Sequence, residues 1–218
     1  MKLMIVDDHQ VVRQGIANLL RSMLPAVAIT EVDNGEDAVA CYGGLRPNVV
    51  LLDMGLPDIS GLEVGRRLRQ RWRGAAILFF TMHDELPMVR QALDIGGLGF
   101  VSKSCAPEEL AEAVKRVAAG QPYIEHPIAT RLAMNQERPV DHRLRDMTQR
   151  EMEVLLMYAR GESVSGIASR LCVSNKTVSN HLAGLKSKLQ VASSVELIHL
   201  AVDAGLVRYG QLEEARRV

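Results

Sequence analysis

Aromatic residues, cysteine and long apolar runs are all scarce in this sequence. Phe, Trp and Tyr make up 4% of the 218 residues, so aliphatic side chains and methionine must fill the cores. The three cysteines (Cys41, Cys105 and Cys172) form no CxxC pair, which argues against a zinc site or a disulfide framework and indicates the reducing cytoplasm. No run reaches the ~18 apolar residues of a membrane helix, and the start MKLMIVDDHQ lacks the core of a signal peptide. We therefore expect a cytoplasmic protein without a membrane partner.

The chain as a whole has no net charge, but its two halves differ in charge. Residues 1–121 carry 13 basic and 15 acidic side chains, a net of −2, whereas residues 143–218 carry 11 and 8, a net of +3. The length suits two modest domains better than one. We predict domains at residues 1–121 and 146–210, joined by a linker at 122–145. A polyanionic partner would bind the basic C-terminal half.

The first half alternates between short apolar runs and longer stretches with helical spacing. This alternation predicts a flavodoxin-like, doubly wound α/β domain with a five-stranded parallel sheet. Runs without polar residues, such as VVLL and ILFF, are typical of strands buried on both faces. The predicted strands are Leu3–Val6, Ile29–Val32, Val49–Leu52, Ile77–Phe80 and Gly99–Val101. The predicted helices are Val11–Leu24, Glu36–Gly43, Gly61–Arg71, Leu86–Ile95 and Pro107–Ala119.

The second half predicts helices only. Prolines and charges interrupt the pattern at 120–146, where we expect a linker with one short helix at Ile128–Met134. Beyond Thr148, amphipathic stretches predict an all-α domain of four helices. These helices are expected at Gln149–Arg160, Val164–Leu171, Lys176–Leu189 and Ser194–Ala204.

Five side chains with complementary chemistry follow the predicted strands. They are Asp7, Asp8, Asp53, Thr81 and Lys103. Because the carboxyl ends of parallel strands share one edge of a sheet, these side chains should meet there. Clustered carboxylates repel unless a cation intervenes, and Mg²⁺ is the usual hard cation of phosphoryl chemistry. One carboxylate could then attack a phosphoryl group while Mg²⁺ and the lysine neutralise its charge. Taken singly, each aspartate could instead be a helix N-cap.

Four motifs in this half resemble those of bacterial receiver domains. They are IVDDH at 5–9, LLDMGLPDISGLE at 51–63, TMHD at 81–84 and GFVSK at 99–103, and the resemblance covers about residues 2–120. It implies that Asp53 accepts a phosphoryl group from a sensor histidine kinase. It also implies that Mg²⁺ binds Asp8, Asp53 and the backbone carbonyl of Gly55, with Asp7 assisting through water.

The same resemblance assigns Lys103 as the phosphate partner, and Thr81 and Phe100 as a switch pair. The Thr81 hydroxyl would move to bond the phosphoryl group, and Phe100 would turn into the vacated space. Two positions depart from the family. Phe100 stands where many receivers have tyrosine, and Ser104 stands where many have proline. In this fold the Lys103–Ser104 peptide would be cis, a costly bond without proline.

A helix-turn-helix pattern lies in the second domain. Residues 172–173 form its turn, and Ser174 caps the second helix. The inner face of the first helix is expected to consist of Ile167, Ala168 and Leu171. The inner stripe of the second helix is expected to consist of Val178, Leu182 and Leu185. The free face of the second helix would enter the major groove of double-stranded DNA.

That free face carries residues suited to DNA, namely Asn175, Lys176, Ser179, Asn180 and Ala183. Asn180 and Lys176 can bond base edges. Ser174, Thr177 and Lys188 suit phosphate contacts. The alternative is an ordinary surface helix whose polar face is merely solvated.

The second domain resembles LuxR-type DNA-binding domains. TQREMEVL at 148–155, ARG at 159–161, IASRL at 167–171, VSNKTVSNH at 173–181 and KLQV at 188–191 carry the resemblance, which spans about residues 146–207. Together with the receiver motifs it points to the NarL/FixJ subfamily. It implies base contacts from Ser179, Asn180 and Ala183. Several relatives have lysine at positions 179 and 183, so binding here should depend more on dimerisation.

The last predicted helix has more apolar residues than a four-helix domain can bury. We expect Val195, Ile198 and Val202 to pack against a second copy of the chain. Burial within the domain is the alternative for any one of them. A two-fold dimer would read an inverted repeat in a promoter.

The sequence as a whole predicts a response regulator whose phosphorylation by a sensor histidine kinase promotes homodimerisation and DNA binding; RNA polymerase is a possible further partner. The protein would not be an enzyme, beyond slow loss of its own phosphoryl group. One rival is a phosphatase, but Gly55 occupies the position of the usual acid/base carboxylate two residues after the nucleophile. Another rival is a phosphorylation-independent regulator whose receiver serves only for dimerisation. The complete set of acidic and switch residues disfavours it.

Overall fold

The computed structural model describes residues 1–82, 85–134, 142–144, 147–171, 173–204 and 206–207, and divides into two compact units, Met1–Met134 and Asn135–Val218. Parts of the predicted TMHD motif, the linker, the helix-turn-helix turn and the end of the second domain lie outside these residues. Among the residues described, no helix combines the length and apolarity that a membrane crossing requires.

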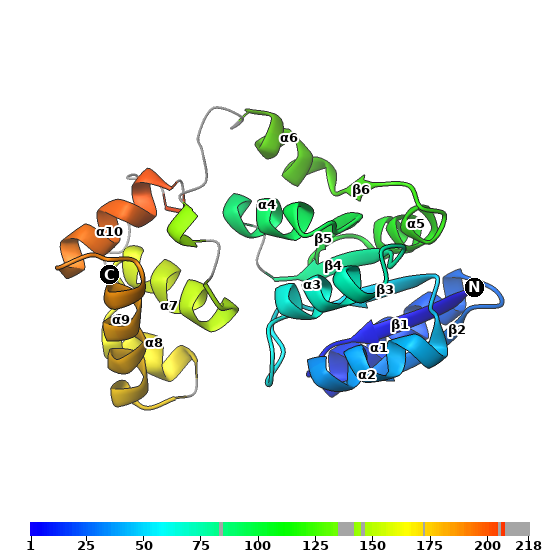
Figure 1. The fold of residues 1–218 in the computed structure, drawn as a ribbon, viewed down its shortest axis with the longest axis horizontal. Coiled ribbons are helices and arrows are strands. Elements are labelled where there is room, and N and C mark those ends of the chain that lie inside the picture. The colour runs from blue at the N-terminus through cyan, green and yellow to red at the C-terminus, as the bar shows by residue number, and fades with distance from the viewer. Residues whose placement is uncertain (83–84, 135–141, 145–146, 172, 205, 208–218) are drawn as a thin grey trace. The chain divides into compact units, whose positions relative to one another are not determined.

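The first unit is a doubly wound α/β domain. Its elements are β1 (Lys2–Val6), α1 (Gln10–Met23), β2 (Ala28–Val32), α2 (Gly35–Leu45), β3 (Val49–Leu52), α3 (Gly61–Arg71), β4 (Ile77–Thr81), α4 (Leu86–Asp94), β5 (Gly99–Ser102), α5 (Pro107–Ala118), β6 (Tyr123–Ile124) and α6 (His126–Met134). The sheet is parallel throughout and has the order β2-β1-β3-β4-β5-β6 (Figure 1). This order confirms the predicted fold class.

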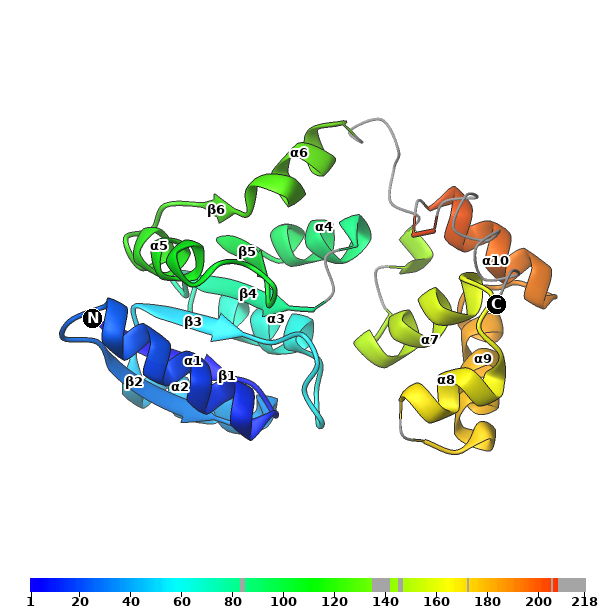
Figure 2. The same ribbon diagram turned by 180° about the vertical axis from the view of Figure 1, so that it is seen from behind.

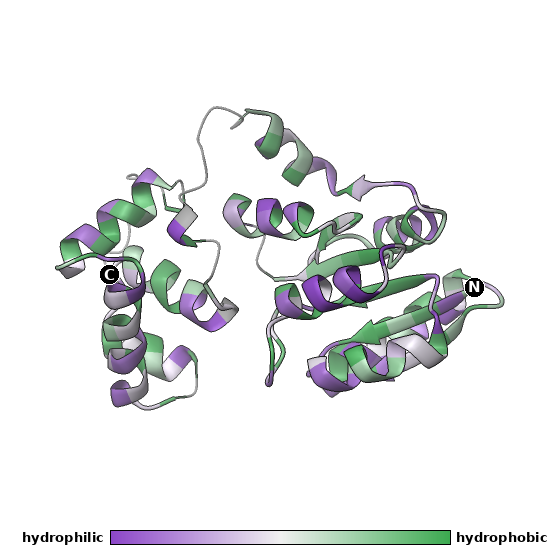
Figure 3. Ribbon diagram, in the orientation of Figure 1, coloured by the Kyte–Doolittle hydropathy of each residue, from purple (hydrophilic) through white to green (hydrophobic). Residues whose placement is uncertain are grey.

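Helices cover both faces of the sheet, so its central strands are buried. Helices α1 and α5 share one apolar cluster with one face of the strands (Figure 2). Helices α2, α3 and α4 pack in sequence against one another on the other face. All four residues of β3, and all five of β4, are buried. The central strands are accordingly drawn in hydrophobic colours, whereas the helices are banded (Figure 3). This confirms the interpretation of the runs VVLL and ILFF.

The sheet has six strands rather than the five predicted. The additional strand, β6, is two residues long and pairs in parallel with β5, with Tyr123 opposite Gly99 and Ile124 opposite Phe100. Two residues are too few to show an alternating pattern. The first unit therefore runs to Met134, and the expected linker at 122–145 contributes β6 and α6 to it. The buried side chain of Ile128 shows that this segment is packed.

Within its described residues, the second unit contains the 3₁₀ helix His142–Leu144 and four α-helices, α7 (Gln149–Ala159), α8 (Val164–Arg170), α9 (Asn175–Lys188) and α10 (Ser194–Asp203). Each α-helix begins after a serine or threonine whose side chain accepts a backbone N–H bond, at Thr148, Ser163, Ser174 and Ser193. These caps explain why the predicted starts lie within one residue of the observed ones. Thr148 and Glu151 form a reciprocal capping box.

Candidate functional site

The predicted acidic site forms at the carboxyl edge of the sheet. Asp7 follows β1 and its N–H donates to the Val32 carbonyl (3.1 Å), while Asp53 follows β3 and its N–H donates to the Val6 carbonyl (2.9 Å). Their side chains are 1% and 5% exposed. Thr81 ends β4 and is buried, and Asp8 is exposed beside Asp7. Ladder bonds therefore hold two buried carboxylates at neighbouring strand ends.

Lys103 joins these carboxylates. Its Nζ lies 2.7 Å from Asp53 Oδ2, in a hydrogen bond, and 2.7 Å from Asp7 Oδ2. Burial raises the pKa of Asp53 above its ordinary value; the Lys103 ammonium opposes this shift and the Asp7 charge adds to it. Burial acts to lower the pKa of Lys103, but the two carboxylates outweigh it and the net direction is upward. Since Asp8 adds a third carboxylate, one ammonium leaves the group with excess negative charge.

These residues fit a divalent cation. Ligand atoms of Asp7, Asp8, His9 and Asp53 lie within 4.8 Å of one another. Asp7 Oδ2 is buried and lies 2.7 Å from the Lys103 Nζ. Carboxylate oxygens gathered in this way match the hard oxygen ligands that Mg²⁺ takes.

His9 was not predicted at this site. Its Nδ1 lies 2.7 Å from Asp8 Oδ1, and its backbone N–H donates to Asp7 Oδ1 (2.8 Å). Its position directly after two aspartates in IVDDH was the available signal. The Asp7–His9 bond closes the turn before α1, but the N-cap of α1 is His9, so Asp7 is not the helix cap of the alternative interpretation.

The loop after Asp53 brings Gly55 close to the acceptor. The N–H of Gly55 bonds the Asp53 carboxylate. The N–H of Gly61 donates to the Met54 carbonyl (3.0 Å), which closes the loop. A Cβ on Gly61 would lie 2.0 Å from the Asp53 carbonyl oxygen, so only glycine fits there.

The switch candidates lie on adjacent strands behind the site. Phe100 is fully buried, and its ring centroid lies 6.5 Å from that of Phe79 on β4. The Lys103 N–H donates to the Thr81 carbonyl (2.8 Å). The peptide between Lys103 and Ser104 is trans, which corrects the cis expectation. Without proline, the trans form is the stable one, and the Ser104 N–H bonds Ser102 Oγ (3.1 Å).

An unpredicted contact joins β5 to the segment that follows α5. The Glu125 N–H donates to the Phe100 carbonyl (3.1 Å), and Glu125 Oε2 accepts the Ser102 N–H (2.7 Å). The backbone of Phe100 is thus bonded to the residue between β6 and α6. Glutamate in an apparent linker carries no sequence signal for such a contact.

The second unit contains the predicted helix-turn-helix of α8 and α9. Five predicted inner-face residues are buried: Ile167, Ala168, Val178, Leu182 and Leu185. Leu171, the residue that follows α8, is only half-buried. Ser174 caps α9 as predicted, its Oγ accepting the Thr177 N–H (3.1 Å).

The free face of α9 carries the predicted DNA residues. Asn175, Lys176, Ser179, Asn180 and Ala183 are all exposed. Ser174 and Thr177 share a side-chain bond of 2.8 Å. Lys188, expected at phosphate, instead places its Nζ 2.7 Å from Glu151 Oε2 on α7. A phosphate contact by Lys188 would therefore compete with this ion pair.

The apolar residues of α10 do not form one free stripe. Val195 is 60% exposed and Ile198 is half-buried, but Val202 is only 7% exposed. Val202 therefore belongs to a core, which corrects its assignment to a dimer contact. It lies near the end of the helix, close in sequence to the buried Leu200 and Ala201.

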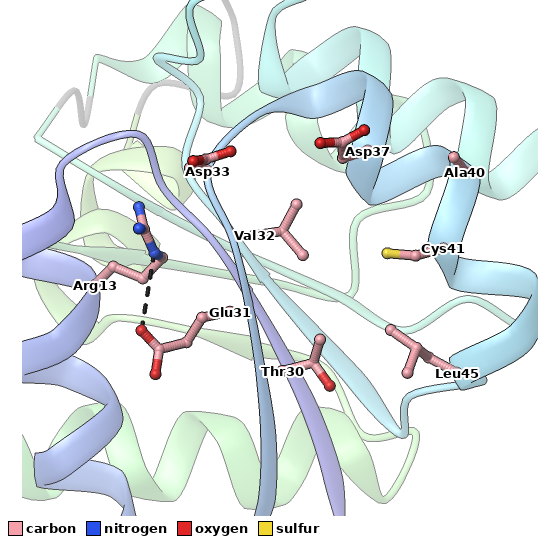
Figure 4. A pocket seen from close by; sticks show the side chains of 9 residues that line it. All are labelled: Arg13, Thr30, Glu31, Val32, Asp33, Asp37, Ala40, Cys41 and Leu45. Atoms are coloured by element: carbon pink, nitrogen blue, oxygen red, sulfur yellow. Dashed lines mark ion pairs between the residues drawn. The ribbon is translucent and has the colours of Figure 1, made fainter.

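A hollow of about 390 Å³ lies between β2 and α2 (Figure 4). Its walls combine Arg13 with the acidic side chains Glu31, Asp33 and Asp37. Arg13 Nε lies 3.8 Å from Glu31 Oε2. None of the predicted site residues lines this hollow.

The two units define a class of protein: an α/β domain with a buried, lysine-paired aspartate, followed by a helix-turn-helix domain. Comparison with family models agrees, because the response regulator receiver domain matches residues 3–115 and the luxR family of bacterial regulatory proteins matches residues 145–201. The chain belongs to the response regulators of the NarL/FixJ type, which regulate transcription through a LuxR-type DNA-binding domain.

Its relatives have the same extent. The transcriptional activator ExaE of Pseudomonas putida is 50% identical over 212 residues, covering 95% of this chain and 99% of that protein. The response regulator UvrY of Escherichia coli is 35% identical over 205 residues, covering 93% and 94%. RcsB of Salmonella enterica, solved with promoter rprA and phosphomimetic BeF3⁻, aligns with a TM-score of 0.56 at 24% identity, covering 93% and 98%. At that identity, RcsB supports the fold alone.

Proposed function

We propose that Asp53 is the phosphoacceptor of this response regulator, that Mg²⁺ binds beside it, and that a sensor histidine kinase supplies the phosphoryl group. The observation that carries the proposal is the buried Asp53 carboxylate held 2.7 Å from the Lys103 ammonium, within a cluster that also contains the carboxylates of Asp7 and Asp8. Asp8, Asp53, the Gly55 carbonyl and, through water, Asp7 would hold the ion. When bound, Mg²⁺ would offset the negative charge of the transferring phosphoryl group.

The residues of the chain divide the work of phosphoryl transfer. An Asp53 oxygen attacks the phosphorus of a phosphohistidine, an O–P bond forms, and the P–N bond breaks with its electron pair returning to the imidazole. Lys103 is already at the site, so it can follow the charge onto the phosphoryl oxygens. Water then attacks the phosphorus slowly, the O–P bond to Asp53 breaks, and inorganic phosphate and the free carboxylate are released. Gly55 supplies no acid/base side chain, so we propose no turnover of outside substrates.

The signal then passes along β4 and β5. A phosphoryl oxygen would attract the Thr81 hydroxyl toward Asp53. The Phe100 ring would then occupy the space that the hydroxyl vacates and stabilise the new arrangement. The phosphorylated protein would bind promoter DNA as a homodimer at an inverted repeat, with the free face of α9 in the major groove. The relative ExaE is a transcriptional activator, which supports activation rather than repression here, with RNA polymerase as a further partner. The setting would be the cytoplasm.

The experiment is phosphorylation of the full chain by a small phosphodonor with Mg²⁺, using wild type and Asp53→Asn. Wild type should gain one acid-stable, base-labile phosphoryl group and bind its promoter more tightly, and Asp53→Asn should do neither. Asp33→Asn, an aspartate that follows β2 and lies outside the acidic cluster, is the control. Phosphate retained by Asp53→Asn would overturn the proposal.

A further inference from the structure

The N-terminus of α2 is capped from two different segments of the chain. Asn34, its own N-cap, accepts the Asp37 N–H (2.8 Å). The two preceding amides go elsewhere: Asp58 Oδ1 accepts the Gly35 N–H (2.9 Å) and Asp58 Oδ2 accepts the Glu36 N–H (2.7 Å). Asp58 lies 22 residues further along, in the loop after Asp53. One carboxylate thus satisfies two helix donors across two segments.

A second observation shows that these segments are held in close approach. A Cβ on Gly35 would lie 2.5 Å from Ile59 Cγ1 and 2.6 Å from Val64 Cγ2, so the backbone of α2 contacts side chains of the loop and of α3 directly. Burial acts to raise the pKa of Asp58, but bonds from the backbone N–H groups of Glu36 and Gly35 outweigh it and lower the pKa below the ordinary value. The clamp is therefore fully charged at neutral pH.

The clamped loop contains the backbone expected to hold the cation. It is closed by the Gly61–Met54 bond at its base, and the Gly55 N–H bonds Asp53. Between these points, Asp58 fixes the outer side of the loop to α2. A carbonyl ligand has no side-chain rotamer of its own, so its direction depends on what restrains the loop.

We propose that Asp58 is a positioning residue for the metal-binding loop: by clamping the loop to α2 it fixes the direction of the Gly55 carbonyl. This inference rests on the proposed Mg²⁺ site. It assigns to Asp58 no contact with the ion or with the phosphoryl group. Loss of the clamp should weaken Mg²⁺ binding while leaving the buried carboxylates and Lys103 in place.

The test is Mg²⁺ titration of the full chain by calorimetry, with hydrogen exchange of the Gly35, Glu36 and loop amides as a second readout. Asp58→Ala should bind Mg²⁺ about 10-fold more weakly, as loss of an outer-shell partner does, and these amides should exchange faster without Mg²⁺. Asp58→Asn, with one acceptor oxygen in place of two, should be intermediate and covers the case in which the alanine variant fails to fold.

Two matched controls separate the clamp from helix stability. Asn34→Ala removes the other cap of α2, and Ser60→Ala removes the cap of α3, where Ser60 Oγ accepts the Glu63 N–H (3.2 Å). Both should keep the affinity of wild type for Mg²⁺. Equal weakening in Asn34→Ala and Asp58→Ala, or no weakening in Asp58→Ala, would overturn the inference. Absence of Mg²⁺ binding by wild type would instead overturn the proposed function, and the inference with it.

Discussion

The ammonium group of Lys103 bridges two buried carboxylates, at 2.7 Å from Asp53 Oδ2 and 2.7 Å from Asp7 Oδ2. This bridge means that Lys103 should affect Mg²⁺ binding and phosphorylation in opposite directions. The lysine repels a metal ion bound to the same carboxylates, yet it is needed to receive the phosphoryl charge. Mg²⁺ binding and phosphorylation should therefore respond in opposite directions when Lys103 is changed.

Lys103→Met should accept phosphate from a small donor about 100-fold more slowly, the scale seen when one charge-stabilising donor is removed. The same variant should bind Mg²⁺ more tightly, because a competing positive charge is gone. Phosphate incorporation and calorimetric Mg²⁺ titration measure the two effects. Lys115→Met on α5 is the control. If both quantities fell together, the lysine would be supporting the fold rather than the charge balance.

Cys105 reports the charge of Glu125. Burial, together with the charges of Glu125 and Glu109, raises the pKa of the Cys105 thiol to about 11. Glu125→Gln should lower that pKa and speed alkylation of Cys105 at pH 9 several-fold, while Gln still accepts the Ser102 N–H. The rate is measured in a background with serine at positions 41 and 172. Glu108→Gln should leave the alkylation rate unchanged. An unchanged rate in Glu125→Gln would show that the Glu125 charge does not raise the pKa of the Cys105 thiol.

Two glycines should respond to alanine in opposite ways. At Gly61, a Cβ would meet the Asp53 carbonyl oxygen at 2.0 Å, so Gly61→Ala should lower the free energy of unfolding by about 1–3 kcal/mol and disturb Mg²⁺ binding. At Gly15, inside α1, nothing lies within 4 Å, and Gly15→Ala should stabilise by about 0.5–1 kcal/mol. Urea denaturation compares them. A tolerated Gly61→Ala would show that the loop does not need its close approach.

Glu151 should make the second unit sensitive to acid. Burial acts to raise its pKa, but bonds from Lys188 and Thr148 outweigh it and lower the pKa below the ordinary 4.5. A lowered folded-state pKa gives stability that is present above 4.5 and lost as pH falls through the folded value. Glu151→Gln should therefore cost about 1 kcal/mol at neutral pH, and less at acid pH. Hydrogen exchange in α7 measures this, and a cost independent of pH would contradict it.

Residues of α9 should separate sequence reading from general DNA affinity. Asn180→Ala should reduce discrimination between promoter and random DNA by about 1–3 kcal/mol. Lys188→Ala, at a residue assigned to a phosphate contact, should instead reduce the salt dependence by about one ion. Binding assays at several salt concentrations distinguish the two. Equal losses on both DNAs in Asn180→Ala would place its contact on the backbone.

The sequence was sufficient for the main architecture because its patterns are long and periodic. Apolar strands such as Val49–Leu52 are buried on both faces, and serine caps such as Ser174 mark where helices begin. The convergence of Asp7, Asp53 and Lys103 followed from one rule of parallel sheets. Local patterns and topology were enough for these features.

The remainder depended on contacts between distant segments. Strand β6 is two residues long, and Glu125 bonds Ser102 across 23 residues, so neither leaves a local pattern. The same holds for Asp58, whose sequence position suggests only a turn. Val202 was assigned to a dimer because the number of apolar residues in α10 was visible, whereas the space available to bury them was not.

Strand β6 determines where an expressed fragment of the first unit should end. A fragment ending at residue 121, where the pattern of α/β repeats stops, would lack β6. Strand β5 would then become an edge strand with unpaired backbone groups. Unpaired edge strands pair with other chains, so such a fragment would tend to self-associate for reasons unrelated to phosphorylation. A fragment that stops at Met134 retains β6 and α6, and β5 keeps its partner strand.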